Sequence, residues 1–128
     1  MMHTSPFGSY RMSAMRATPY PNRLLDLSAT LPETQLRILN LIVRLTLGWQ
    51  AGANGERRAT TQISLWQIKK RIGRSSVMPV AEAIAALADL GVIEARDLNG
   101  EPIDMRDLAR ARRRALLLAI SRSWVEEP

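Results

Sequence analysis

The sequence contains no cysteine and a single histidine, His3, close to its N-terminus. The absence of cysteine excludes disulfide bonds, thiolate catalysis, and zinc or iron–sulfur sites with cysteine ligands. A single imidazole excludes metal sites with several histidines and argues against a catalytic triad that depends on histidine. We therefore expect a protein with no metal ion, no cofactor and no enzymatic activity.

Long hydrophobic runs are also missing. The two longest unbroken apolar runs, 83–88 and 115–120, have six residues each, whereas a membrane-spanning helix needs about 20. Residues 1–18 lack the apolar stretch of a signal peptide, so none is expected. The sequence therefore predicts a protein without a membrane partner.

An excess of positive charge is the strongest feature of the composition. The 128 residues include 18 Lys and Arg against 12 Asp and Glu, a formal net charge of +6. Four arginines fall within the five positions 110–114, with acidic residues on both sides. A basic balance favours an anionic partner, and nucleic acid is the expected one. A solvated charged surface is the alternative interpretation of the arginine cluster.

Apolar spacing predicts one domain over residues 18–124, between a flexible tail, 1–17, and a short tail, 125–128. Because 46% of the residues are hydrophobic, this domain can bury a core. We expect four helices. Three of them cover residues 23–27, 31–49 and 65–72, and the fourth begins after Ser75 or Ser76 and ends at Leu90.

The ends of these helices carry capping signals. Asn22, Ser64, and either Ser75 or Ser76 suit N-caps, whose side chains bind free backbone N–H groups of the first turn. Gly73 suits the left-handed position that follows a helix. Strands are predicted over 59–63, 92–98 and 115–121, with Asn99-Gly100 as a two-residue hairpin turn.

The predicted order is helix, strand, helix, glycine turn, helix, strand, wing and strand. This is the layout of a winged helix-turn-helix, so we predict a mainly α fold with a small β-hairpin. The second of the two helices joined by the glycine turn would present one face to the core and another to a DNA groove. The alternative is a helical hairpin that packs for structural reasons alone.

Several motifs follow one another in a specific order between residues 18 and 95. They are Thr18-Pro19-Tyr20-Pro21-Asn22, Arg44-Leu45-Thr46-Leu47-Gly48-Trp49, Ile63-Ser64-Leu65, Ile72-Gly73 and Gly91-Val92-Ile93. In this order they resemble the N-terminal domain of the phage replication protein O family. The resemblance implies a winged helix-turn-helix that binds double-stranded DNA at the replication origin of a phage or mobile element. It also implies a cytoplasmic protein, at the nucleoid of a bacterial cell.

The expected recognition helix departs from that family, whose members place basic and hydroxyl residues on its outward face. No Lys or Arg lies between Ser75 and Leu90. Helical spacing puts Val80, Ala83, Ile84 and Leu87 toward the core. It puts five other side chains outward: Met78, Ala81, Glu82, Ala85 and Asp89.

Candidate DNA contacts gather at the turn and at the wing. At the turn they are Lys69, Lys70, Arg71 and Arg74 as phosphate clamps, with Ser75, Ser76, Met78 and Glu82 at the start of the recognition helix. At the wing they are Arg96, Arg110, Arg112, Arg113 and Arg114. Solvated surface, or ion pairs between wing arginines and Asp104 or Asp107, is the alternative.

The three tryptophans, Trp49, Trp66 and Trp124, are expected in the core or an interface rather than as base-stacking platforms.

Two further interpretations stay open beside origin recognition. Transcriptional regulation by the same fold is the nearer one. The other is a protein-interaction module that docks a partner on the alanine-rich outer face of Ala81, Ala85 and Ala86. Replication proteins or a second copy of the chain are the protein partners we consider. Salt-dependent DNA binding would separate the two classes.

Overall fold

The computed structural model describes residues 8–11, 16–52, 55–107, 111 and 114–126. These residues form a small α+β fold of four α-helices, three strands and a terminal 3-10 helix. The helices are α1 (Asn22–Ser28), α2 (Glu33–Thr46), α3 (Leu65–Ile72) and α4 (Met78–Asp89), and the 3-10 helix covers Arg122–Trp124. The strands are β1 (Thr60–Ser64), β2 (Ile93–Arg96) and β3 (Ala115–Ile120).

The strands form one antiparallel sheet in the order β1-β3-β2. Leu118 of β3 lies opposite Thr61 of β1 on one side and Ala95 of β2 on the other. The side chains of β3 alternate between buried and half-buried, so one face of the sheet supports the core. The predicted β-hairpin, formed by β2 and β3, is therefore only part of the sheet, because β1 pairs with the other edge of β3.

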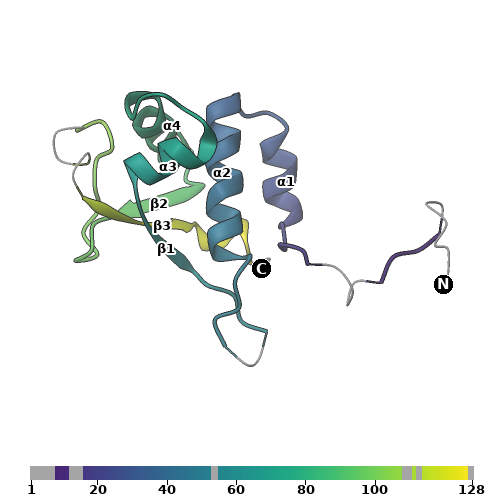
Figure 1. Ribbon diagram of the computed structural model, residues 1–128. Coiled ribbons are helices and arrows are strands. Elements are labelled where there is room, and N and C mark those ends of the chain that lie inside the picture. The colour runs from purple at the N-terminus through teal and green to yellow at the C-terminus, as the bar shows by residue number, and fades with distance from the viewer. Residues whose placement is uncertain (1–7, 12–15, 53–54, 108–110, 112–113, 127–128) are drawn as a thin grey trace.

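One hydrophobic core joins the helices to the sheet. Helix α2 contacts α3, α4, β1 and β3, and Figure 1 shows α1 on the opposite side of α2 from α3 and α4. The α2 residues Ile38, Leu39, Ile42 and Val43 are fully or almost fully buried. Burial of such a continuous apolar stripe is the main stabilising contribution to a helix of this length.

Helix α3 begins and ends as its sequence predicts. The hydroxyl of Ser64 accepts a hydrogen bond from the Gln67 backbone N–H at 3.2 Å, and the Gln67 side-chain oxygen accepts one from the Ser64 N–H at 3.0 Å. This reciprocal capping box satisfies two backbone donors at the helix start. Gly73 ends the helix at a φ of 75°, which a residue with a Cβ rarely adopts.

Other predicted helix starts are wrong. Pro21 and Pro32 precede α1 and α2 with extended ψ angles, so Asn22 lies inside α1 rather than capping it. Val77 precedes α4 and already has helical φ and ψ angles, and no side chain caps that helix. Neither Ser75 nor Ser76 therefore caps α4. Helix α2 is also shorter than predicted, because it stops at Thr46.

The turn after β2 differs from the predicted two-residue hairpin. The carboxylate of Asp97 accepts hydrogen bonds from the backbone N–H groups of Asn99 at 2.9 Å and Glu101 at 3.0 Å. Gly100 has a φ of 84°, and Arg96 forms an isolated bridge with Pro102. The chain thus turns through a three-residue loop and pairs back on β2 before it reaches β3.

The alanine face of α4 is buried, which corrects the prediction that it points outward. Ala81 is 1% exposed and Ala85 is 4% exposed. Helix α4 packs against α2 and α3, and small side chains allow such neighbours to approach closely. This face therefore does not serve as the docking surface for a partner that we considered from the sequence.

All helices and strands of the described residues fall within residues 18–124. Residues 8–11, 16 and 17 belong to no helix or strand. Val125 packs against the core beside Trp124, so the packed part extends one residue beyond the predicted end. None of the helices in the described residues has the length and apolar character needed to cross a membrane.

Candidate nucleic-acid interface

The α3–α4 turn is fastened to the first two turns of α2. Arg37 of α2 donates a hydrogen bond to the carbonyl oxygen of Ile72 at 2.8 Å. Arg74 of the turn donates two hydrogen bonds to the hydroxyl of Thr34, and its Nη2 lies 3.7 Å from a Glu33 carboxylate oxygen. Arg74, a predicted phosphate clamp, therefore holds the turn in place through its guanidinium group.

The outward face of α3 carries an exposed aromatic ring between cations. The Nζ atom of Lys70 lies 4.3 Å from the centroid of the Trp66 ring, and that of Lys69 lies 5.8 Å away. Spacings of three and four residues place these side chains together on one helix face. Among the described residues, the side chains of Lys69, Lys70 and Arg71 form no hydrogen bond or ion pair. Their positive charge is therefore available to a ligand.

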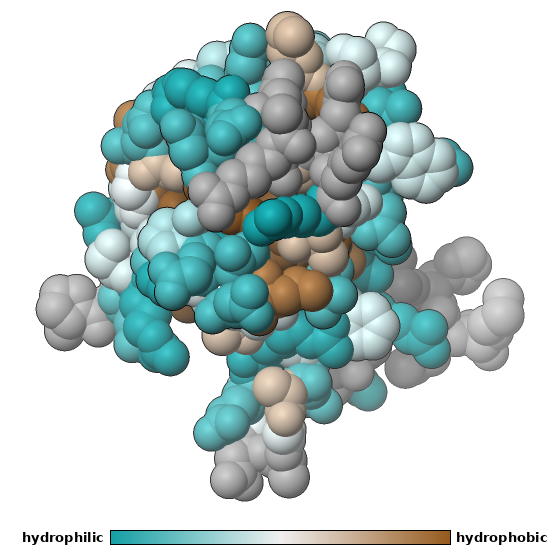
Figure 2. Space-filling model, turned by 90° about the vertical axis from the view of Figure 1, so that its left-hand side faces the viewer, coloured by the Kyte–Doolittle hydropathy of each residue, from teal (hydrophilic) through white to brown (hydrophobic). Residues whose placement is uncertain are grey.

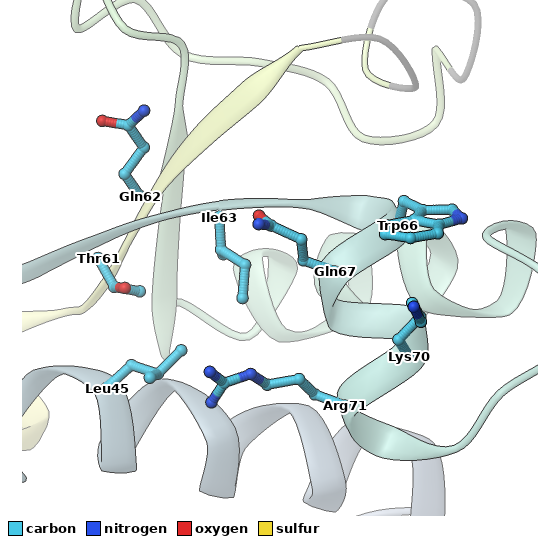
Figure 3. Close-up of a pocket in the computed structure, with 8 residues that line it drawn as sticks. All are labelled: Leu45, Thr61, Gln62, Ile63, Trp66, Gln67, Lys70 and Arg71. Atoms are coloured by element: carbon cyan, nitrogen blue, oxygen red, sulfur yellow. The ribbon is translucent and has the colours of Figure 1, made fainter.

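A cleft of about 360 Å³ opens beside this face, between α2, β1 and α3. Figure 3 shows the Arg71 side chain extending toward Leu45, below Ile63 of β1. Trp66 and Lys70 lie at the opposite end of the same view. The cleft is lined by Leu45, Thr61, Gln62, Ile63, Trp66, Gln67, Lys70 and Arg71.

The exposed side of α4 is acidic and apolar. Met78 is 53% exposed and Glu82 is also exposed, as predicted. Asp89 forms an ion pair of 2.6 Å with Arg106, which follows the β2 turn. The hydrogen bond from Arg106 holds the pKa of Asp89 below its ordinary value, and Asp89 raises the pKa of Arg106. The helix itself supplies no cation to a phosphate.

Only part of the predicted wing cluster lies in the described residues. Arg96 donates a hydrogen bond to the carbonyl oxygen of Gly100 at 2.9 Å and lies 3.7 Å from Glu94. Arg114 is exposed and borders a hollow of about 240 Å³ with the Asp97 turn. Figure 2 shows this end of the molecule, where hydrophilic side chains surround a few exposed hydrophobic ones. The other predicted wing residues, Arg110, Arg112 and Arg113, lie outside the described residues.

Arg106, which lies between the β2 turn and the wing arginines in the sequence, forms an ion pair with Asp89 of α4. The carboxylate of Asp104 accepts a hydrogen bond from the Arg106 backbone N–H at 2.9 Å. The ion pair between Arg106 and Asp89 ties the segment after β2 to the end of α4.

The predicted core position is wrong for two of the three tryptophans, and a place in an interface stays a prediction for them. Trp66 is 54% exposed and Trp49 is 51% exposed, and each lies beside a cation. Trp124 packs against the core and under the guanidinium of Arg23, 4.1 Å from the ring centroid. The spacing of Trp66 from two lysines one helical turn later could have indicated an exposed stacking surface.

Comparison of the chain with protein-family models, with curated proteins and with solved structures finds no match. The resemblance to the phage replication protein O family therefore stays a prediction. The residues that the structure describes contain no group of three or more His, Cys, Asp or Glu that could hold a metal ion.

Proposed function

We propose that the chain is a winged helix-turn-helix protein that binds double-stranded DNA without enzymatic activity. The observation that carries the proposal is the order α2-β1-α3-α4-β2-β3, in which β3 pairs with both other strands. A left-handed glycine, Gly73, separates the two helices of the candidate DNA-binding pair. The strands β2 and β3 would then flank the wing.

The distribution of charge favours contact through α3 and the wing. Lys69, Lys70 and Arg71 lie on α3, and Arg114 lies at the start of β3. Figure 1 places the start of α3 and the turn after β2 at the same left-hand side of the molecule. Such cations bind phosphates of any sequence. Binding energy would therefore come mainly from the DNA backbone.

Base readout by α4 would be limited. Its exposed Glu82 can accept a hydrogen bond from a cytosine amino group, whereas guanine is usually read by Arg or Lys. A carboxylate close to the DNA also repels phosphates. We therefore propose modest sequence specificity, centred on the first half of α4.

The resemblance in sequence supports origin recognition for a phage or mobile element as the biological role. Transcriptional regulation would use the same surface. Either role would place the protein at the bacterial nucleoid, and origin recognition would add replication proteins as partners. Burial of Ala81 and Ala85 weighs against the protein-docking alternative, which depended on these two residues and on the half-buried Ala86.

Chemical-shift mapping with a random-sequence duplex tests this proposal. We expect backbone amides of α3 and of the Asp97–Glu101 turn to shift on titration, and those of α1 to stay unchanged. The random duplex should be bound, and a duplex from the element that carries the gene should be bound more tightly. Shifts confined to α1, or none with either duplex, would contradict the proposal.

A further inference from the structure

The cleft between α2, β1 and α3 combines three features that a nucleotide requires. The first is an aromatic platform, because about half of the Trp66 surface is exposed at the edge of the cleft. Nucleobases of unpaired strands stack on such rings, and a neighbouring cation strengthens the interaction. Lys70 already lies against this ring.

The second feature is a cation directed into the cleft. Arg71 extends along the floor toward Leu45, and it has no hydrogen-bond or ion-pair partner among the described residues. A guanidinium group can bind phosphate oxygens through two parallel N–H donors. Lys70, beside Trp66, and Arg71, at the other end of the cleft, therefore offer positive charge at both ends.

The third feature is a hydrogen-bonding side chain of fixed orientation. Gln67 lines the cleft, and its side-chain oxygen accepts the hydrogen bond from the Ser64 backbone. This contact leaves the two N–H groups of the amide to donate to another acceptor, such as a base carbonyl oxygen. The cleft volume, about 360 Å³, lies at the lower end of the range for small-molecule sites, as one nucleotide requires.

We infer that this cleft binds an unpaired nucleotide of single-stranded DNA. The base stacks on Trp66 and the adjoining phosphates contact Lys70 and Arg71. The strand must be unpaired, because the flat faces of bases are covered by their neighbours inside a duplex. The inference goes beyond duplex binding and does not depend on how α4 contacts DNA.

Fluorescence anisotropy with two labelled octamers tests the inference. One probe is oligothymidine and the other is an abasic strand of the same length, which keeps the phosphates but has no bases. We expect the wild-type protein to bind oligothymidine about 5- to 100-fold more tightly, as stacking of one base contributes. The Trp66→Ala variant should bind both probes with equal affinity.

Trp49→Ala is the matched control, because Trp49 is equally exposed and also lies beside a cation, Arg58. It should keep the preference for oligothymidine, and so should Trp66→Phe, which keeps an aromatic ring. The double variant Lys70→Ala, Arg71→Ala should weaken the binding of both probes by similar factors. Circular dichroism of each variant establishes that it folds.

Equal binding of the two probes by the wild-type protein would overturn the inference. Loss of the preference in Trp49→Ala but not in Trp66→Ala would also overturn it. If duplex binding fails while the preference for oligothymidine depends on Trp66, the inference holds and the proposed duplex function fails. If duplex binding is normal and the preference is absent, the inference alone fails.

Discussion

The guanidinium of Arg74 donates two hydrogen bonds to the hydroxyl of Thr34, at 3.1 Å from Nε and 2.9 Å from Nη2. These contacts join the α3–α4 turn to the start of α2 across 40 positions of the sequence. A residue of the turn itself therefore fastens the α3–α4 pair to α2. Arg74 thus contributes more to the placement of the candidate DNA-binding helices than to the positive charge of their surface.

Arg74→Ala should lower the free energy of unfolding by about 1–3 kcal/mol, because hydrogen bonds from a charged donor are lost. Urea unfolding of this variant, of Thr34→Val and of the double variant forms a double-mutant cycle. We expect a coupling energy of at least about 0.5 kcal/mol between the two positions. A coupling energy of zero would mean that the contact does not hold the turn.

Lys69→Ala combined with Lys70→Ala should weaken binding to all duplexes by about the same factor, since phosphate contacts do not depend on sequence. Competition gel shifts with several unrelated duplexes measure this. Arg122→Ala is a control at an exposed cation away from this turn, one that pairs with Glu126 at 2.8 Å, and it should leave duplex binding unchanged. A changed order of preference among duplexes in the double variant would show that the two lysines read bases.

Leu87→Ala should destabilise the fold by about 2–5 kcal/mol, as large-to-small changes in a core do. Leu87 is completely buried on α4. Glu82→Ala, on the exposed side of the same helix, should change the free energy of unfolding by less than about 0.5 kcal/mol. It should leave DNA affinity unchanged or raise it. Thermal unfolding followed by circular dichroism compares the two, and equal stability would contradict this orientation of α4.

Asp89 should make stability depend on pH through its hydrogen bond with Arg106. The folded-state pKa of Asp89 is lowered, so the contact stabilises the fold above the unfolded pKa of about 3.9. That stabilisation is lost as the pH falls through the folded value. We expect Asp89→Asn to melt slightly below the wild type at neutral pH and together with it in stronger acid. A melting difference that stays constant over this range would contradict the assignment.

Much of the fold follows from local sequence signals. The N-cap at Ser64, the left-handed Gly73 and the buried stripe of Val80, Ile84 and Leu87 are confirmed, because each depends on residues a few positions apart. Helix starts are less predictable. Backbone angles at Val77 decide whether a preceding serine can cap the helix, and these angles depend on the whole turn.

Long-range contacts account for what the sequence could not show. The spacing of one helix alone places Ala81 and Ala85 outward, but α2 and α3 cover more of α4 than a single apolar stripe requires. In the sequence, nothing distinguishes Arg74 from the other cations near the turn, because its contact with Thr34 spans 40 positions. The cleft at Trp66 depends on three elements that are separated in the chain.

The salt dependence of duplex binding tests DNA recognition most directly. Lys69, Lys70, Arg71 and Arg114 form no hydrogen bond or ion pair among the described residues, and three more wing arginines, Arg110, Arg112 and Arg113, lie nearby in the sequence. If four to seven of them contact phosphates, the slope of log K against log salt concentration should lie between about −4 and −6. Anisotropy titrations from low to physiological salt should give a slope in this range. A slope near zero, or no binding at low salt, would contradict DNA recognition by this protein.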